Sequence, residues 1–242
     1  MPGVLTMETP DLVVPVREGS VNEQLRYAVR SWAANLPHRR VWVVGHRPAW
    51  LDNVGHIPTR QAGTKYQNTT TAVRAACEHP DVSPRFLLMN DDFFVMQPQD
   101  GAMPVFNRGP VREVEPYYEA RASGMYLRGM RETRRLLEDL GHPDPLSYEL
   151  HVPMPITTAG MLDALDIGKD LDVLHKRTLF GNLAGLGGRR IEDVKILHRG
   201  PRFQKDAAFL STMPDAFAQG MVGGFIRRRF SQACRYETRR RR

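Results

Sequence analysis

The sequence predicts an α/β fold with a Rossmann-like core, in which helices flank a central, mostly parallel sheet and a helical C-terminal part follows. Two patterns support this prediction. Short apolar segments, each ended by a breaker, alternate with amphipathic helical segments through the first half of the chain. Residues 86–89 are apolar without alternation, which is typical of a strand covered on both faces in a parallel sheet.

The first elements have the order strand, helix, strand. Valine-rich residues 11–16 and 40–45 predict the first two strands. Between them, Ser20 with Glu23 three residues later predicts a capping box at the start of a helix, which Pro37 ends. The apolar face of this helix consists of Leu25, Val29, Trp32 and Leu36.

The second half is less regular and more helical. The periodicity of residues 117–140 predicts a helix whose arginines face solvent. Residues 181–188 are rich in glycine but lack the P-loop lysine and the dinucleotide-binding spacing, so we expect a loop without a phosphate there. The remaining predicted elements are strands at 55–58 and 86–89 and helices at 69–78, 157–165 and 205–219.

Composition sets the size and class of the protein. A chain of 242 residues with 41% hydrophobic content predicts one large domain over residues 1–234 with a basic tail at 235–242. We expect a cytoplasmic protein, because no apolar stretch has the ~18 residues of a membrane span and no secretory signal begins the chain. Cys77 and Cys234 have neither disulfide nor zinc spacing.

The net charge of +7 is concentrated at the C-terminus, where residues 239–242 are four arginines. A tail of this kind is usually solvated and frayed. The alternative is that it binds nucleic acid through phosphate contacts, without an aromatic or helix-turn-helix pattern beside it.

Two adjacent carboxylates, Asp91 and Asp92, follow the apolar run and Asn90. Ligands of parallel sheets collect at the carboxyl ends of the strands. Because two buried aspartates repel each other, this pair suits a divalent cation, and oxygen ligands favour Mg²⁺ or Mn²⁺. The alternative is that Asn90 or Asp91 only caps a turn.

Basic and amide side chains are expected at the same edge of the sheet. The connection after the first strand carries Arg17 and Asn22 and leads to a helix N-terminus, where free N–H groups attract phosphate. Lys65 follows the third strand and could neutralise a diphosphate. Alternatively Arg17 and Lys65 are surface charges, with Asn68 or Thr69 as a helix cap.

His151 is the best candidate for a general base. Pro153 and Pro155 stiffen the chain beside it, and an imidazole titrates near neutral pH. The alternative is a structural histidine, which is the commoner role.

The order of these motifs resembles the Stealth family of sugar-phosphate transferases, which have a nucleotide-sugar-binding core similar to GT-A glycosyltransferases. The Asn90-Asp91-Asp92 block and the His151-Val152-Pro153 block are the most informative parts. The chain departs from the family after the first strand, where Arg17 and Glu18 replace a Trp-Val-Asn-Gly-like segment. The similar blocks are residues 22–31, 48–51, 56–58, 86–94 and 149–153.

The resemblance implies a role for each part of the chain. Residues 11–110 would bind the nucleotide sugar and residues 111–234 would bind the acceptor. Asp91 and Asp92 would hold the metal and the donor diphosphate, and Asn90 would shape the turn. The site residues implied in this way also include His151 for acceptor activation and Arg177 as a catalytic arginine.

We therefore expect a metal-dependent transferase that moves a sugar 1-phosphate or a glycosyl group from a nucleotide sugar to an acceptor hydroxyl. The acceptor would be a glycan, a protein of a phage or cell surface, or a nucleic acid. Arg17, Asn22, Lys65 and Asn90 are the expected donor-binding residues. An alternative of another class is a nucleic-acid-binding protein without catalysis.

Overall fold

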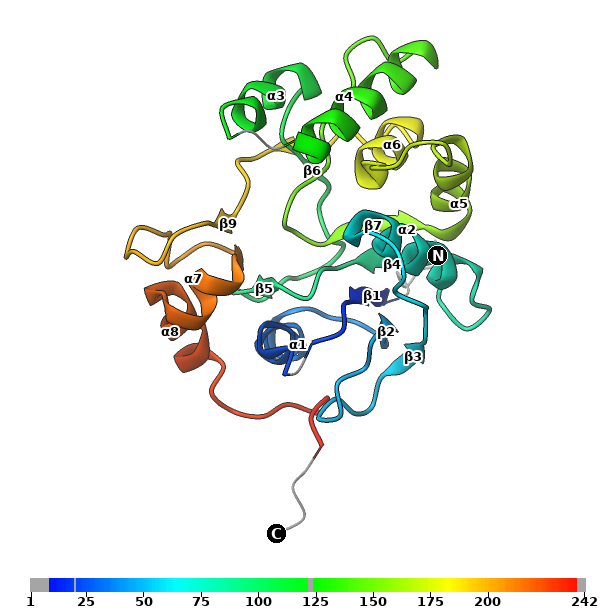
Figure 1. Ribbon diagram of the computed structural model, residues 1–242. Helices are drawn as coiled ribbons and strands as arrows, with labels where there is room; N and C mark the ends of the chain where they lie inside the picture. The colour runs from blue at the N-terminus through cyan, green and yellow to red at the C-terminus, as the bar shows by residue number, and fades with distance from the viewer. Residues whose placement is uncertain (1–8, 20, 122–123, 239–242) are drawn as a thin grey trace, which may run out of the picture.

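The computed structural model describes residues 9–19, 21–121 and 124–238 and has an α/β fold with a mixed five-stranded sheet (Figure 1). The first four strands in chain order run parallel, and the last runs antiparallel to its neighbour. The predicted α/β class is therefore confirmed. In spatial order the strands are β3 (Gly55–Ile57), β2 (Val41–Gly45), β1 (Asp11–Val16), β4 (Arg85–Leu88) and β7 (Met154–Thr157).

Helices cover both faces of this sheet. Helix α1 (Glu23–Asn35) packs on one face, and α2 (Lys65–Glu78) and α5 (Thr158–Ile167) pack on the other. The side chains of β1 alternate between the two cores: Leu12 faces α1 and Val13 faces α2, each with no exposed surface. Burial on both faces explains why β1 is apolar from Leu12 to Val16 and β4 from Phe86 to Leu88.

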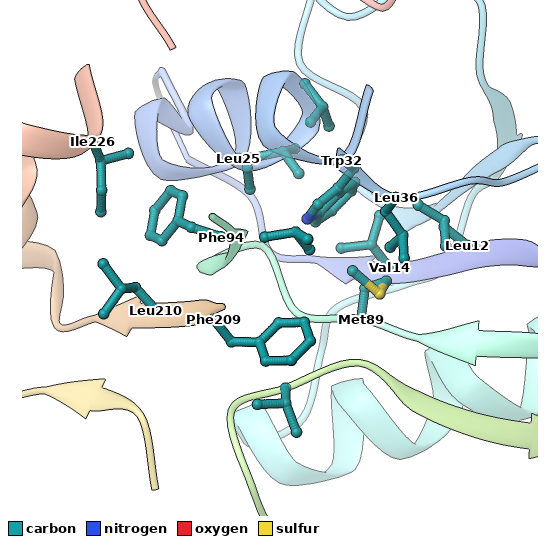
Figure 2. Close-up of a cluster of buried hydrophobic side chains, with 14 of the residues drawn as sticks. Leu12, Val14, Leu25, Trp32, Leu36, Met89, Phe94, Phe209, Leu210 and Ile226 are labelled. Atoms are coloured by element: carbon teal, nitrogen blue, oxygen red, sulfur yellow. The ribbon is translucent and has the colours of Figure 1, made fainter. Parts of the chain in front are cut away.

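The core beneath α1 is built around Trp32 (Figure 2). Leu25 and Trp32 face Leu12 and Val14 of β1, and all four side chains are fully buried. The indole N–H of Trp32 donates to the carbonyl oxygen of Phe93 at 2.7 Å, so its one polar group is satisfied. Burial of a side chain of this size stabilises the fold by about 1.5 to 3 kcal/mol.

Helix α1 begins differently from the prediction. The N-cap residue is Asn22, in the left-handed region at φ 49°, and Glu23 is already the first helical residue. The predicted capping box is therefore wrong, because Glu23 does not occupy its third helical position, and Ser20 lies outside the described residues. The helix ends at Asn35, before Leu36 turns extended ahead of Pro37.

Helix α2 begins four residues earlier than predicted. Thr64 is its N-cap: the Thr64 hydroxyl accepts from the backbone N–H of Gln67 at 3.3 Å, and the Gln67 side chain accepts from the Thr64 N–H at 2.9 Å. This reciprocal pair is a capping box. The alternative that Asn68 or Thr69 caps the helix is wrong, and Lys65 becomes the first helical residue.

The predicted helix at 117–140 is two helices, α3 (Val111–Glu119) and α4 (Gly124–Asp139). The predicted helix at 205–219 is wrong in its first part, because residues 209–212 form a strand. Pro214 starts a short helix immediately after that strand, in keeping with the preference of proline for a first turn. The remaining helices are α6 (Lys176–Leu183), α7 (Pro214–Gln219) and α8 (Met221–Arg229).

A second, three-stranded sheet continues from the turn that follows β4. Its strand order is β5 (Phe93–Val95), β10 (Phe209–Thr212) and β9 (Lys195–Ile196). A two-stranded sheet pairs β6 (Phe106–Asn107) with β8 (Arg189–Arg190). No helix within the described ranges is long and apolar enough to cross a membrane.

The described part of the predicted tail is packed rather than frayed. Glu237 forms an ion pair with Arg30 of α1 at 2.6 Å, and Tyr236 is 3% exposed. The backbone of Glu237 also bridges Leu51. The sequence predicts a solvated tail, but the buried ring of Tyr236 and the paired carboxylate of Glu237 hold residues 235–238 against the domain. Residues 239–242 lie outside the described part of the chain.

Candidate functional site

A cavity of about 210 Å³ lies at the carboxyl edge of the parallel strands. Its wall brings together four of the predicted site residues, Arg17, Lys65, Asn90 and Asp91. They come from three places in the chain: Arg17 follows β1, Lys65 begins α2, and Asn90 and Asp91 follow β4. The cavity also contacts Val16, Val44, Thr59 and Ala72.

Arg17 and Lys65 give the cavity a basic side. Both are exposed, so a ligand can reach their cations from solvent. Lys65 is also the first residue of α2, and the N-terminus of a helix carries partial positive charge. The three sources of positive potential meet at one wall, which suits an anionic group such as a phosphate.

Two amide side chains hold the loops around the cavity through hydrogen bonds to the backbone. The Gln61 amide donates to the carbonyl of Val16 at 2.8 Å and accepts from the N–H of Glu18 at 3.1 Å. Asn68 closes a similar ring with the backbone of Gly63, at 2.9 and 3.0 Å. These amides are engaged by backbone groups, so Arg17, Lys65, Asn90 and Asp91 are the principal groups for a ligand.

Asn22 does not line this cavity. Its side-chain amide donates to the carbonyl oxygen of Arg17 at 3.0 Å, across the loop between β1 and α1. The left-handed backbone at Asn22 allows this tight loop, since asparagine tolerates positive φ better than most residues. The structure thus gives Asn22 a positioning role toward Arg17.

Asp91 lies half-buried on the acidic side of the cavity. Burial raises the pKa of its carboxyl to about 6, and the charge of Asp92 adds to this rise, while Lys195 and Arg17 oppose it. A carboxylate in this environment is destabilised at neutral pH. A cation beside it would remove the penalty.

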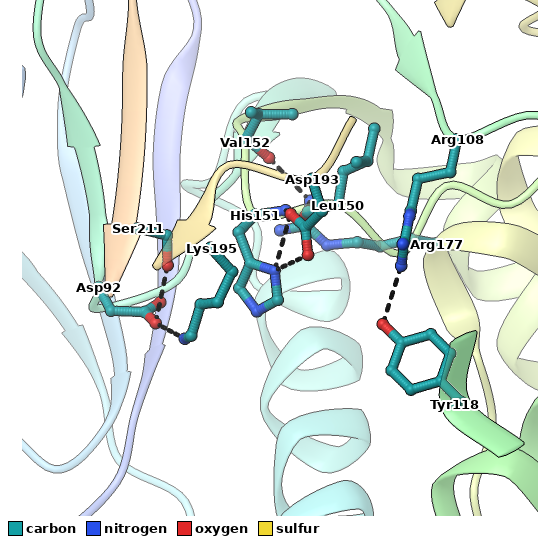
Figure 3. A network of polar contacts seen from close by, with 10 residues as sticks. All are labelled: Asp92, Arg108, Tyr118, Leu150, His151, Val152, Arg177, Asp193, Lys195 and Ser211. Atoms are coloured by element: carbon teal, nitrogen blue, oxygen red, sulfur yellow. Dashed lines mark hydrogen bonds and ion pairs between the residues drawn. The ribbon is translucent and has the colours of Figure 1, made fainter. Parts of the chain in front are cut away.

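Asp92 is buried and already has a cationic partner (Figure 3). The ammonium of Lys195 forms an ion pair with Asp92 Oδ2, and the hydroxyl of Ser211 donates to the same oxygen at 3.0 Å. The two aspartates thus differ: one faces the cavity, and the other faces the three-stranded sheet.

The donor set fits a divalent cation that arrives with a phosphate ligand. Across residues 9–19, 21–121 and 124–238, no three His, Cys, Asp or Glu side chains gather into a metal-binding group. Mg²⁺ commonly uses one or two carboxylates together with substrate phosphates, and keeps several waters. Asp91, with the nearby amide oxygen of Asn90, supplies ligands of this type.

His151 forms a pair with Asp193, which the sequence analysis missed (Figure 3). Its Nδ1 lies 2.9 Å from Asp193 Oδ2, and its backbone N–H donates to Asp193 Oδ1 at 3.1 Å. Burial raises the pKa of Asp193, but hydrogen bonds from His151 outweigh this and leave it below the usual value. Because a carboxylate only accepts, Nδ1 carries a proton and Nε2 is the basic nitrogen.

The His151 ring packs against the residue that follows Asp91 and Asp92, which we call the acid pair. The ring of Phe93, next to Asp92, lies edge-on to the His151 ring with 5.9 Å between centroids. The side chain of His151 is 28% exposed. A base and an acidic pair thus share one region, at the junction of the two sheets.

Arg177 is buried and braces this junction. Its guanidinium donates to the carbonyl oxygens of Leu88 and Val152 at 2.9 Å each and lies 3.4 Å from Asn90 Oδ1. Burial lowers its pKa to about 10, and the charges of Glu149, Asp92 and Asp193 resist this fall. It ties the end of β4 to the segment that carries His151, so its observed contacts are those of a positioning residue.

Arg108 and Tyr118 lie on the other side of the His151–Asp193 pair from Asp92 (Figure 3). The Arg108 guanidinium donates to the Tyr118 hydroxyl at 2.9 Å. Tyr126 packs on Tyr118 with ring centroids 4.7 Å apart. This side of the site is therefore aromatic and basic.

A larger hollow, of about 800 Å³, lies at the opposite edge of the sheet. Its lining includes Arg39 and Ser83, and both bind the fully buried carboxylate of Asp11. The Trp42 indole also donates to Asp11, at 2.9 Å. The polar groups of this hollow therefore stabilise the amino ends of the strands. The predicted site residues gather at the carboxyl edge instead, so we assign the site to that edge.

The chain matches no protein-family model, and a search of curated proteins finds no relative. The resemblance of its sequence blocks to the Stealth family therefore stays a prediction. The case for function depends on the geometry of the site.

Proposed function

We propose that the protein is a metal-dependent transferase that uses a nucleotide-sugar donor and has a GT-A-like core. One observation supports this proposal above the others. A cavity at the carboxyl edge of parallel strands joins Arg17, Lys65 and Asp91, and the His151–Asp193 pair lies next to the same acid pair. The arrangement combines an anion-binding wall, an acidic wall and an oriented base.

The donor diphosphate would lie against Arg17, Lys65 and the N-terminus of α2. Ligand sites for whole small molecules usually have about 300 Å³ or more. A cavity of about 210 Å³ is smaller, so it would take the diphosphate and its nearest groups. The rest of the donor would extend over the cavity rim.

Asp91, with Asn90 and the adjacent carboxylate of Asp92, would hold Mg²⁺ or Mn²⁺ at this diphosphate. The bound cation would supply electrostatic stabilisation of the charge that develops on the departing phosphate. Arg17 and Lys65 would add to the same stabilisation from the opposite wall. Arg177 would keep Asn90 and the His151 segment in place through its carbonyl contacts.

His151 would act as the general base. Its Nε2 would accept the proton of the acceptor hydroxyl as that oxygen attacks the donor. Asp193 holds Nδ1, which fixes the required tautomer and would stabilise the imidazolium that forms. Attack at the β-phosphorus of a nucleoside-diphosphate sugar would break the bridge between the two phosphates, release a nucleoside monophosphate and move a sugar 1-phosphate. Attack at the anomeric carbon would break the bond from the sugar to the diphosphate, release the nucleotide and move the sugar alone. The Stealth-like blocks favour the first.

The acceptor would approach from the side of Arg108 and Tyr118. It would carry the attacking hydroxyl on a glycan, a surface protein or a nucleic acid. The non-catalytic nucleic-acid-binding alternative has less support. Two helix arginines that could contact a nucleic acid are already paired: Arg30 with Glu237, and Arg131 with Glu115.

A thermal-shift screen tests the proposal. UDP-, GDP-, CMP- and ADP-sugars are added with and without Mn²⁺, and one donor should raise the melting temperature only with the cation. Asp91→Asn should lose this shift and the EDTA-sensitive turnover. Asp163→Asn, at an exposed position on α5, is the matched control and should keep both. A screen in which no nucleotide sugar stabilises the wild-type protein would refute the proposal.

A further inference from the structure

Lys195 is held beside Asp92 by the pairing of the small sheet. Strand β10 pairs with both neighbours at Ser211, which lies opposite Phe93 on one side and opposite Lys195 on the other. This register places the Lys195 ammonium and the Ser211 hydroxyl on the same carboxylate oxygen of Asp92.

The ion pair is well shielded from water. The side chains of Lys195 and Asp92 are 14% and 11% exposed. Exposed ion pairs contribute little to stability, but a shielded one that also accepts a hydrogen bond has a defined geometry, and the loss of one partner leaves a buried charge. Lys195 is therefore a fixed charge in the site rather than a mobile surface lysine.

Lys195 also belongs to the segment that orients the base. Asp193 lies two residues earlier, and alternate residues of an extended segment point to the same side. Figure 3 shows Lys195 between Asp92 and His151, with Asp193 above the imidazole ring. One short segment thus carries a partner for the acid pair and a partner for the base.

The charges of this group explain what Lys195 does to a divalent cation. Asp91 and Asp92 are adjacent, but the ammonium neutralises Asp92 and leaves Asp91 as the open carboxylate on the cavity wall. A divalent ion that takes an oxygen of Asp92 as a ligand would face a positive charge at that oxygen. Repulsion between two cations at contact distance is large in a partly buried site.

We propose that Lys195 is a resident counter-ion of Asp92 that competes with Mg²⁺ or Mn²⁺, so that the acid pair holds the metal weakly until a donor diphosphate brings it. The inference rests on the metal-dependent function proposed above. Without donor, Lys195 and Ser211 satisfy Asp92. With donor, the diphosphate oxygens supply the ligands and the negative charge that let the cation displace or outweigh the ammonium.

Direct measurement of Mn²⁺ binding without donor tests the competition. Free Mn²⁺ is followed by electron paramagnetic resonance during titration of wild-type protein, Lys195→Met and Lys195→Arg. Lys195→Met should bind Mn²⁺ about tenfold more tightly than wild type, because the competing charge is gone. Lys195→Arg keeps the charge and should match wild type, as should the exposed control Lys169→Met.

A second charge-removing variant, Lys195→Gln, tests the inference in case Lys195→Met does not fold. Lys195→Gln keeps a hydrogen-bond donor for Asp92, removes the charge, and should also bind Mn²⁺ more tightly. The gain should disappear in Lys195→Gln combined with Asp92→Asn. Equal or weaker Mn²⁺ binding in folded Lys195→Met or Lys195→Gln would overturn the inference, even where donor and Mn²⁺ together stabilise the wild type and so uphold the proposed function.

Discussion

Asp91→Asn should stabilise the protein at neutral pH while it removes donor binding. The folded-state pKa of Asp91 is raised from 3.8 to about 6 by burial and by Asp92. A raised carboxyl pKa means that the folded protein holds the proton more tightly than the unfolded chain does. Stability is therefore lost as the pH rises from 3.8 through 6, and the full penalty remains above that range.

The magnitude follows from this shift. A rise of about two pKa units corresponds to about 3 kcal/mol, since one unit is 1.36 kcal/mol. Asp91 is partly exposed to the cavity, so solvent screening reduces the expected penalty to about 1 to 2 kcal/mol. Asparagine carries no charge and should recover that amount at about pH 8, and almost none at about pH 4.

Urea denaturation in EDTA, followed by tryptophan fluorescence, measures this difference at both pH values. The control Asp163→Asn lies on an exposed part of α5 and should leave the free energy of unfolding unchanged. The reasoning would be refuted by an Asp91→Asn protein that is no more stable than wild type at about pH 8. It would equally fail if the same gain persisted at about pH 4.

Three further changes test other parts of the site. Asp193→Asn should lower kcat by about a hundredfold or more and flatten its pH profile without raising the KM of the donor; an unchanged kcat would exclude His151–Asp193 as the base. Arg177→Met should lower the free energy of unfolding by about 3 kcal/mol in denaturant titrations, because it leaves two buried carbonyl oxygens without a hydrogen-bond donor. Lost activity with unchanged stability would instead make Arg177 catalytic. Thr64→Ala should cost about 1 kcal/mol at the start of α2, measured in the same way, and no change there would contradict the capping box.

Local sequence patterns predict the first half of the fold well. Residues 12–16 and 86–89 are uniformly apolar because both faces of their strands are covered, and this pattern needs no knowledge of distant contacts. The position of Asp91 and Asp92 at the edge of the sheet is predictable for the same reason, because they follow the end of such a strand closely. Residues from three connections then meet at one edge because parallel strands end together.

Pairing between distant segments accounts for what the sequence does not reveal. Asp193 and Lys195 reach the site only because β9 joins β10, and β10 joins β5, far from both in sequence. The predicted helix at 205–219 includes the four residues of β10, which lie just before the helix that begins at Pro214. The one local signal was the alternation of Asp193 and Lys195, which becomes informative only once a partner strand is known.

Calorimetric titration of a nucleotide sugar in the presence and absence of Mn²⁺ tests the central claim most directly. We predict binding that requires the cation in wild-type protein, falls about tenfold or more in Lys65→Met, and is unchanged in the exposed control Lys169→Met. Binding that is indifferent to Mn²⁺ and to Lys65→Met would contradict the assignment of this cavity as the donor site.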